Sequence, residues 1–349
     1  YGVPVYQLLG GRFREKVRLY ADTHIEEGRA TGILMEPEKV GRILKGYMDQ
    51  GFTVVKILSV ELLMAQEGNT CGPLDWVDEL RAVEEKVRQV TRTGTRAESS
   101  AANALLYDFN RIPHPFTNMH VTEQGLDQLD EYIGRVRSVI GTKVPLAIDH
   151  FGHFPLPDMI KIARRLEKYH LAWLEDMLPW YLTDQYRELK HATTAPIATG
   201  EDMYLAESFE PLLQAGALDV VHPDLLTSGG ILETKKLGDL AARYGASMAL
   251  HMCESPVAAL AGAHMATASE NFFAQEHDAF DSEWWQDLII GPVKPIVKDG
   301  FTVITDAPGL GIEGLNEDLI REHGPMKGKD VWVSTDEWNQ ETSLDRIWS

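Results

Sequence analysis

Three carboxylates at equal intervals constrain this sequence more than any other feature. Asp149, Glu175 and Glu201 follow one another 26 residues apart, and each ends a short apolar run. Helix-like stretches at 155–168 and 183–193 lie between them. A strand and a helix repeated at this interval predict parallel β/α units, because a parallel crossover needs a dozen residues or more. We therefore expect an α/β fold, a (β/α)₈-type (TIM-like, modified) barrel, whose strand ends meet on one face.

A cation is the simplest explanation for three carboxylates on one face. Without it they would repel one another strongly, and a site made only of oxygen ligands suits Mg²⁺ or Mn²⁺ rather than zinc. We therefore predict one metal site, with Asp149, Glu175 and Glu201 as its ligands. A single acid at a strand end is more simply explained as a solvated loop carboxylate. That explanation fails for a whole series in register.

The same interval continues along the chain. Asp224, His251 and Glu276 follow Glu201 at spacings of 23, 27 and 25 residues, each again at the end of an apolar run. From about residue 1 to 320 the sequence resembles the enolase superfamily. Within it, the mandelate racemase branch and its acid-sugar dehydratases, such as galactonate and mannonate dehydratases, are most similar. The resemblance implies that the three carboxylates hold one Mg²⁺. It also implies that Asp224 and His251 form a dyad and that Glu276 hydrogen-bonds the enolate while protonated.

The resemblance implies a lyase that dehydrates a sugar acid. In such a reaction His251 removes the α-proton of an aldonic or aldaric acid, and loss of the β-hydroxyl gives a 2-keto-3-deoxy acid. Racemisation, epimerisation or cycloisomerisation of a 2-hydroxy acid is the alternative, and a barrel that binds without catalysis is another. The Lys-x-Lys motif of the racemases is reduced to Lys56-Ile57-Leu58, which disfavours a second base. Lys56 is expected to contact the substrate carboxylate or the metal ligands, or to reach solvent.

The residue that acts as general acid, giving a proton to the departing hydroxyl, does not follow the sequence pattern of the related dehydratases. They show Asp-x-His where this chain has Phe151, so His150 and His153 are the candidates. A second set lies in the long excursion at 60–122, which we interpret as a lid over the catalytic face, or alternatively as a surface excursion. Tyr107 and Arg111 there are substrate or acid candidates by residue type.

The chain divides into three parts. Residues 1–16 resemble the segment that leads from an α+β capping domain into the barrel, and we expect that domain to lie outside the numbered chain. Residues 17–290 form the barrel, with strands at 17–24 and 52–59 and helices at 37–50 and 123–140. Residues 291–349 are expected to pack on the cap or on a neighbouring subunit, as in a homo-oligomer.

The net charge and the composition limit the classes of molecule that this protein is expected to bind. The net charge of −20 argues against nucleic acid and anionic membrane as partners, and no run is long enough to span a bilayer. Two cysteines far apart in sequence predict free thiols in a reduced cytoplasm. We therefore expect a cytoplasmic protein whose partner is a small-molecule sugar acid.

Overall fold

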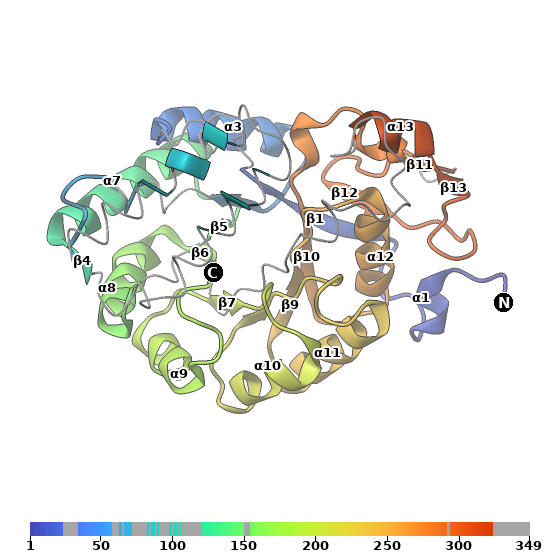
Figure 1. Cartoon of the computed structure of the whole chain (residues 1–349). Coiled ribbons are helices and arrows are strands. Elements are labelled where there is room, and N and C mark those ends of the chain that lie inside the picture. Colours follow the sequence, from blue (N-terminus) through green and yellow to red (C-terminus); the bar gives the residue numbers. More distant parts are fainter. Residues whose placement is uncertain are drawn as a thin grey trace.

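A closed parallel barrel forms the centre of the molecule (Figure 1). The computed structural model describes residues 1–23, 34–57, 66–71, 120–149, 154–291 and 294–323, with isolated positions between 63 and 105. Within these residues neighbouring strands follow chain order, and the last pairs with the first through Glu276 and Tyr20. The expected barrel is therefore confirmed. Its strands are β1 Lys16–Asp22, β2 Val55–Ile57, β5 Leu146–Ile148, β6 Leu171–Glu175, β7 Ile197–Thr199, β8 Val220–Val221, β9 Ser247–Leu250 and β10 Phe272–His277.

Large and small side chains together fill the interior of the barrel. Two aromatic residues, Tyr20 and Trp173, pack edge to face there, with 5.4 Å between their ring centroids. Most of the other residues in this buried cluster are alanines, which leave room for the two rings. The barrel is thus a packed core and not a pore, so the chemistry must lie at its rim. The cluster comprises Tyr20, Val54, Ala147, Trp173, Ala198, Val220, Ala249 and Ala274.

Helices surround the barrel and bury their apolar faces against the strands (Figure 1). The predicted helices are confirmed to within two residues at each end. Thr122 and Ser255 cap two of them by accepting hydrogen bonds from backbone N–H groups of the first turn. No described helix is long and apolar enough to cross a membrane. The helices are α3 Pro37–Asp49, α7 Glu123–Ile140, α8 Leu156–Leu166, α9 Thr183–Ala192, α10 Leu205–Gln214, α11 Ile231–Arg243 and α12 Pro256–Thr267.

Segments that are distant in sequence pack together beside β1 and α12. Strand β12 (Phe301–Val303) pairs antiparallel with the beginning of β1. The short helix α1 (Val5–Leu8) contacts α12, and Val5 donates a backbone hydrogen bond to the carbonyl of Gly309. Strands β11 (Ile289–Ile290) and β13 (Gly314–Leu315) pair with each other, and α13 (Glu317–His323) follows. Residues 324–349 lie outside the described residues.

The two ends of the excursion at 60–122 are held together. Strand β3 (Thr70–Cys71) pairs antiparallel with β4 (His120–Val121), and Asn69 donates a side-chain hydrogen bond to the carbonyl of Leu63. Most of the excursion between these points lies outside the described residues. Its function as a lid stays a prediction.

A buried arginine joins α7 to the beginnings of two barrel strands. The guanidinium of Arg137 donates hydrogen bonds to the carbonyl of Tyr169 at 2.9 and 3.1 Å, that of His170 at 3.1 Å and that of Val144 at 2.7 Å. These carbonyls belong to the segments that lead into β5 and β6. Since β5 and β6 carry two of the expected metal ligands, Arg137 helps to set the position of the site from the opposite end of the barrel.

We predict that Arg137→Met lowers the free energy of unfolding by about 2–4 kcal/mol, because the buried carbonyls lose their donor. Urea unfolding followed by circular dichroism measures the effect. Arg135→Met is the matched control, since Arg135 lies on the same helix and pairs with the exposed Glu38. The free energy of unfolding should fall much less in Arg135→Met than in Arg137→Met. Equal losses in the two variants would contradict the importance of the carbonyl contacts.

Candidate active site

Successive strands bring six polar residues to the same rim of the barrel. They occupy the C-terminal ends of neighbouring parallel strands, where a closed barrel makes side chains converge. Asp224 and His251 also form a backbone bridge between the ends of β8 and β9. The residues predicted from the sequence are therefore neighbours in space. Asp149 follows β5, Glu175 ends β6, Glu201 follows β7, Asp224 follows β8, His251 follows β9 and Glu276 lies in β10.

Glu175 links two groups of metal-binding side chains. Its carboxylate lies within 4.8 Å of ligand atoms of Asp149 and Asp176, and within the same distance of ligand atoms of Glu201 and His222. Burial, and then the charge of Asp149, raise the pKa of Glu175 well above its ordinary value. Buried carboxylates that oppose one another's ionisation are stabilised by a cation. Because the predicted ligands offer only carboxylate oxygen, the donor set fits a hard divalent ion.

A buried lysine lies among these carboxylates. The Nζ atom of Lys56, at the middle of β2, lies 2.7 Å from Asp149 Oδ2, 3.1 Å from Glu175 Oε1 and 2.9 Å from Glu276 Oε1. Its side chain is only 1% exposed. Burial opposes the charge, but the surrounding carboxylates outweigh it and raise the pKa of Lys56 well above its ordinary value. Lys56 therefore remains an ammonium and does not reach solvent.

Two ring side chains of the barrel interior lie beside Glu175. The indole Nε1 of Trp173 donates to Glu175 Oε2 at 2.5 Å, and His222 Nδ1 lies 3.3 Å from Glu175 Oε1. His222 is fully buried, and burial followed by the charge of Lys56 lowers its pKa to about 4. Its other ring nitrogen lies 2.8 Å from the hydroxyl of Tyr20. The indole thus holds Glu175 through a hydrogen bond, and the neutral imidazole lies beside the same carboxylate.

His251 and Asp224 form a hydrogen-bonded pair at the rim. His251 Nδ1 lies 2.7 Å from Asp224 Oδ2, whereas Nε2 lies 3.6 Å from Glu201 Oε2 and 3.8 Å from Glu276 Oε2. Burial opposes protonation of the imidazole, but Glu201, Glu276 and Asp224 outweigh it and raise the pKa of His251 well above its ordinary value. The Asp224 contact directs Nε2 toward the acidic mouth of the barrel.

Glu276 differs from the expectation of a protonated hydrogen-bond donor. Although burial opposes ionisation, the nearby charges of Lys56 and His251 lower the pKa of Glu276 to about 2. Its Oε2 atom accepts a hydrogen bond from the backbone N–H of Met252 at 3.1 Å. Glu276 is thus ionised in this arrangement, and its protonation beside an enolate stays a prediction. The physical reason for the ionisation is the Lys56 ammonium, whose distance from Glu276 cannot be read from the sequence.

Four of the predicted site residues cannot be placed. His150 and His153 after β5, and Tyr107 and Arg111 in the excursion, lie outside the described residues. Their functions remain predictions.

Three further acids belong to the site and were not assigned from the sequence. Asp22 ends β1, and its Oδ2 lies 3.8 Å from Lys56 Nζ. Asp176 follows Glu175 and accepts a hydrogen bond from Thr199 Oγ1 at 2.5 Å. Glu254, three residues after His251, contacts Asp224. The position of Asp22 at a strand end was a usable signal, since it matches the other five acids. No comparable signal existed for Glu254.

The comparison with known families agrees with this geometry. A family model described as enolase C-terminal domain-like matches residues 114–319, which is more than half of the chain. The chain belongs to this family. The predicted membership of the enolase superfamily is thereby confirmed.

Relatives of this enolase-like chain include named sugar-acid dehydratases. It is 28% identical over 325 residues to the D-xylonate dehydratase of Haloferax volcanii, across 92% of this chain and 65% of that protein. It is 24% identical to the D-gluconate/D-galactonate dehydratase of Picrophilus torridus, across 91% and 66%. The chain thus spans about two thirds of the length of these curated relatives.

A solved structure shows the same architecture. The mandelate racemase/muconate lactonizing enzyme-like protein from Rubrobacter xylanophilus superposes with a TM-score of 0.71 at 29% identity. The match covers 92% of this chain and 72% of that one.

We predict that Lys56→Met destabilises the protein by about 3–5 kcal/mol in EDTA, because the buried carboxylates lose their shared cation. In excess Mg²⁺ the loss should shrink, since a divalent ion among the same carboxylates replaces part of the charge. Urea unfolding in the two buffers measures both values. Lys45→Met is the control, because Lys45 is an exposed lysine on α3 paired with Asp49. An equal loss in both buffers would contradict a link between Lys56 and the metal site.

Proposed function

We propose that this protein is a Mg²⁺-dependent dehydratase of an aldonic or aldaric acid. The observation that carries the proposal is the convergence of a carboxylate cluster and an Asp–His pair on one barrel rim. His251 Nε2 lies 3.6 Å from Glu201, an expected metal ligand, so base and metal would face the same substrate. The names of the xylonate and gluconate/galactonate dehydratases support the choice of reaction and substrate class.

The metal would be held by Asp149, Glu175 and Glu201. When bound, Mg²⁺ supplies a Lewis acid that stabilises negative charge on the substrate carboxylate. Lys56 balances the charge of Asp149, Glu175 and Glu276, and in our proposal its ammonium adds to the positive potential at the substrate carboxylate. Glu276 then acts as an ionised partner of Lys56 that sets the direction of the ammonium.

His251 would move the protons of the reaction. A cation bound by Glu201 would offset the charge that raises the pKa of His251 and so favour the neutral imidazole. The Nε2 atom of that neutral imidazole removes the α-proton, while Asp224 accepts a hydrogen bond from Nδ1–H and so determines which tautomer is present. The electron pair released at the α-carbon forms a carbon–carbon double bond as the β-hydroxyl leaves. The same imidazole returns its proton to that hydroxyl, so water departs in a syn elimination. Tautomerisation of the resulting enol gives the 2-keto-3-deoxy acid.

We predict that Glu175→Gln or Glu201→Gln abolishes Mg²⁺ binding measured by isothermal titration calorimetry. Each substitution replaces an anionic ligand by a neutral amide in an all-oxygen site. Glu188→Gln is the control, because Glu188 lies exposed on α9. Normal Mg²⁺ binding by both Glu175→Gln and Glu201→Gln would show that the metal assignment is wrong.

We predict that His251→Asn lowers dehydration and solvent-deuterium exchange at C2 by at least about 100-fold, because the substitution removes proton transfer. A panel of aldonic and aldaric acids, assayed for 2-keto acid formation, first identifies the substrate. Mg²⁺ affinity should barely change. His191→Asn is the control, because His191 lies exposed on α9.

Two outcomes would redirect the proposal. C2 exchange retained in His251→Asn would move the base to Lys56 or to a residue of the excursion such as Tyr107. C2 exchange without 2-keto acid formation would favour epimerisation over dehydration.

A further inference from the structure

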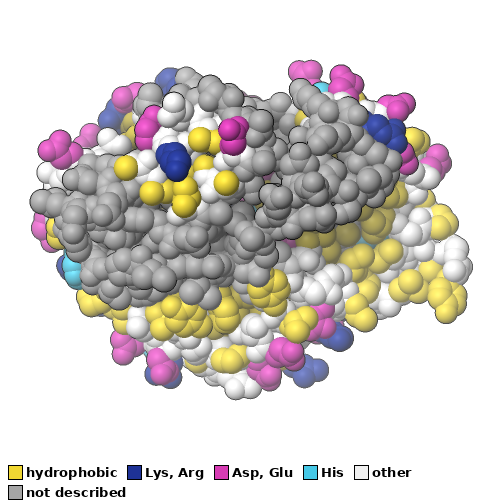
Figure 2. Space-filling view, viewed as in Figure 1, with side chains coloured by type: hydrophobic (Ala, Val, Ile, Leu, Met, Phe, Trp, Pro, Cys, Tyr) yellow, Lys and Arg dark blue, Asp and Glu magenta, His cyan; other side chains and the backbone are white. Residues whose placement is uncertain are grey.

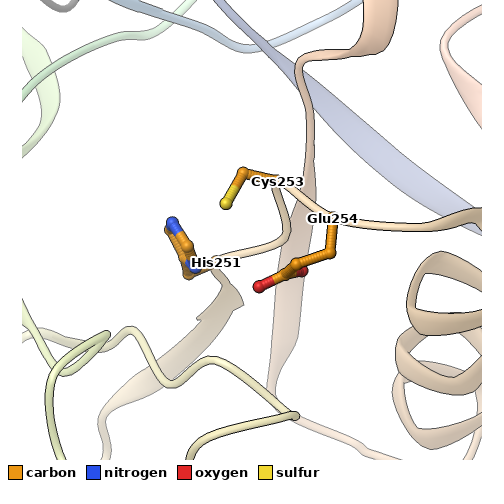
Figure 3. Close-up of side chains that lie close together, drawn as sticks. All are labelled: His251, Cys253 and Glu254. Carbon is orange, nitrogen blue, oxygen red and sulfur yellow. The ribbon is translucent and has the colours of Figure 1, made fainter. Parts of the chain in front are cut away.

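A second carboxyl group lies behind the Asp–His pair. Glu254 is on the turn after β9, close to His251 and Cys253, and Figure 3 shows its carboxyl group directed toward the imidazole. The Glu254 carboxyl is also within hydrogen-bonding reach of Asp224. Its Oε2 atom is buried and accepts no hydrogen bond from a donor among the described residues. Two carboxyl groups in such contact need a shared proton, because two carboxylates offer only acceptors.

The surroundings of the two acids decide which of them carries this proton. Asp224 accepts a hydrogen bond from His251 Nδ1 at 2.7 Å and from the backbone N–H of Leu226 at 2.6 Å. Burial opposes its ionisation, but hydrogen bonds from His251 and Glu254 outweigh it and lower the pKa of Asp224. Burial, and then the contact with Asp224, raise the pKa of Glu254 to about 8. Glu254 is therefore the acid that is protonated at neutral pH.

The backbone around Glu254 is held in place. Trp285 is buried, and its Nε1 donates to the carbonyl of Glu254 at 2.8 Å.

As outlined by the described residues, the space bounded by Asp224, His251, Glu254 and Gln275 is too small for a water molecule. A water cannot replace the Glu254 hydroxyl as the donor to Asp224. The contact is thus direct and enclosed.

We propose that Glu254 is a positioning residue whose protonated carboxyl donates a hydrogen bond to Asp224 and holds it against His251. This role rests on the proposed function only in that His251 acts as the base. The titratable groups that face Glu254 are Asp224 at the end of β8, and His251 and Cys253 on the same turn. Above about pH 8 the donor becomes a second anion beside Asp224, and attraction changes to repulsion. The Asp224–His251 pair then loses its support.

The first test compares two substitutions in the full protein with Mg²⁺ and the sugar acid identified in the panel. Glu254→Met removes the donor and should lower kcat by about 10–100-fold with little change in KM, the usual scale for a group that supports a functional residue from behind. Glu254→Gln restores a donor and should recover most of that loss. It should also remove the alkaline fall in kcat near pH 8. Glu270→Met, at an exposed position after α12, is the control.

The second test needs no substrate. The folded-state pKa of Glu254 near 8 lies above its ordinary value of 4.5, so its stabilisation is complete below about pH 4.5 and is lost as pH rises toward 8. Glutamine does not titrate. In excess Mg²⁺, the Tm of the wild type should fall relative to that of Glu254→Gln by at least about 3 °C between pH 5 and pH 8.5. In an Asp224→Asn background this difference should shrink.

The outcomes separate the two proposals. If the wild type converts no sugar acid, the proposed dehydration fails, and the Tm series alone decides the protonation of Glu254. Parallel Tm curves for the wild type and Glu254→Gln would overturn the shared proton. Equal kcat values for the wild type and Glu254→Met would overturn the positioning role.

Discussion

The site depends on charge balance around one buried ammonium. Lys56 emerges from β2 among acids carried by β1, β5, β6 and β10, and it contacts three of them at 3.1 Å or less. One positive charge cannot neutralise that many buried carboxylates. The excess of negative charge appears in the raised pKa values of Glu175 and His251. A barrel that buries so many acids at one rim is therefore arranged to accept a further cation.

The sequence predicted the architecture because the barrel is a regular repeat. A carboxylate, or the imidazole of His251, at the end of each apolar run, at intervals of 23 to 27 residues, is a local pattern that can be read without knowing any contact. Helices were predictable for the same reason, since their apolar periodicity and flanking residues lie within one segment. The convergence of Asp149, Glu175 and Glu201 then followed from the geometry of parallel strands.

The details of protonation were not predictable in this way. Whether Glu276 is ionised depends on Lys56, which is distant in sequence and lies on a strand separated from β10 only by β1. His222 follows β8 and lies beside Glu175 of β6, and only the distance between them reveals this contact. Glu254 lies on the same turn as His251, but its contact with Asp224 joins the ends of two different strands. Such contacts have no periodic signature.

The filling of the barrel interior limits how this enzyme-like scaffold can change. Trp173 is at once the largest side chain of that layer and the donor to Glu175, and Tyr20 contacts both Trp173 and His222. A substitution that alters the volume of this layer therefore also displaces the carboxylate above it. Substitutions in the layer between the strands and the helices do not displace this carboxylate, so more of them can be tolerated there. Amino-acid substitutions in related proteins should therefore accumulate outside the barrel interior before they affect Tyr20, Trp173 and His222.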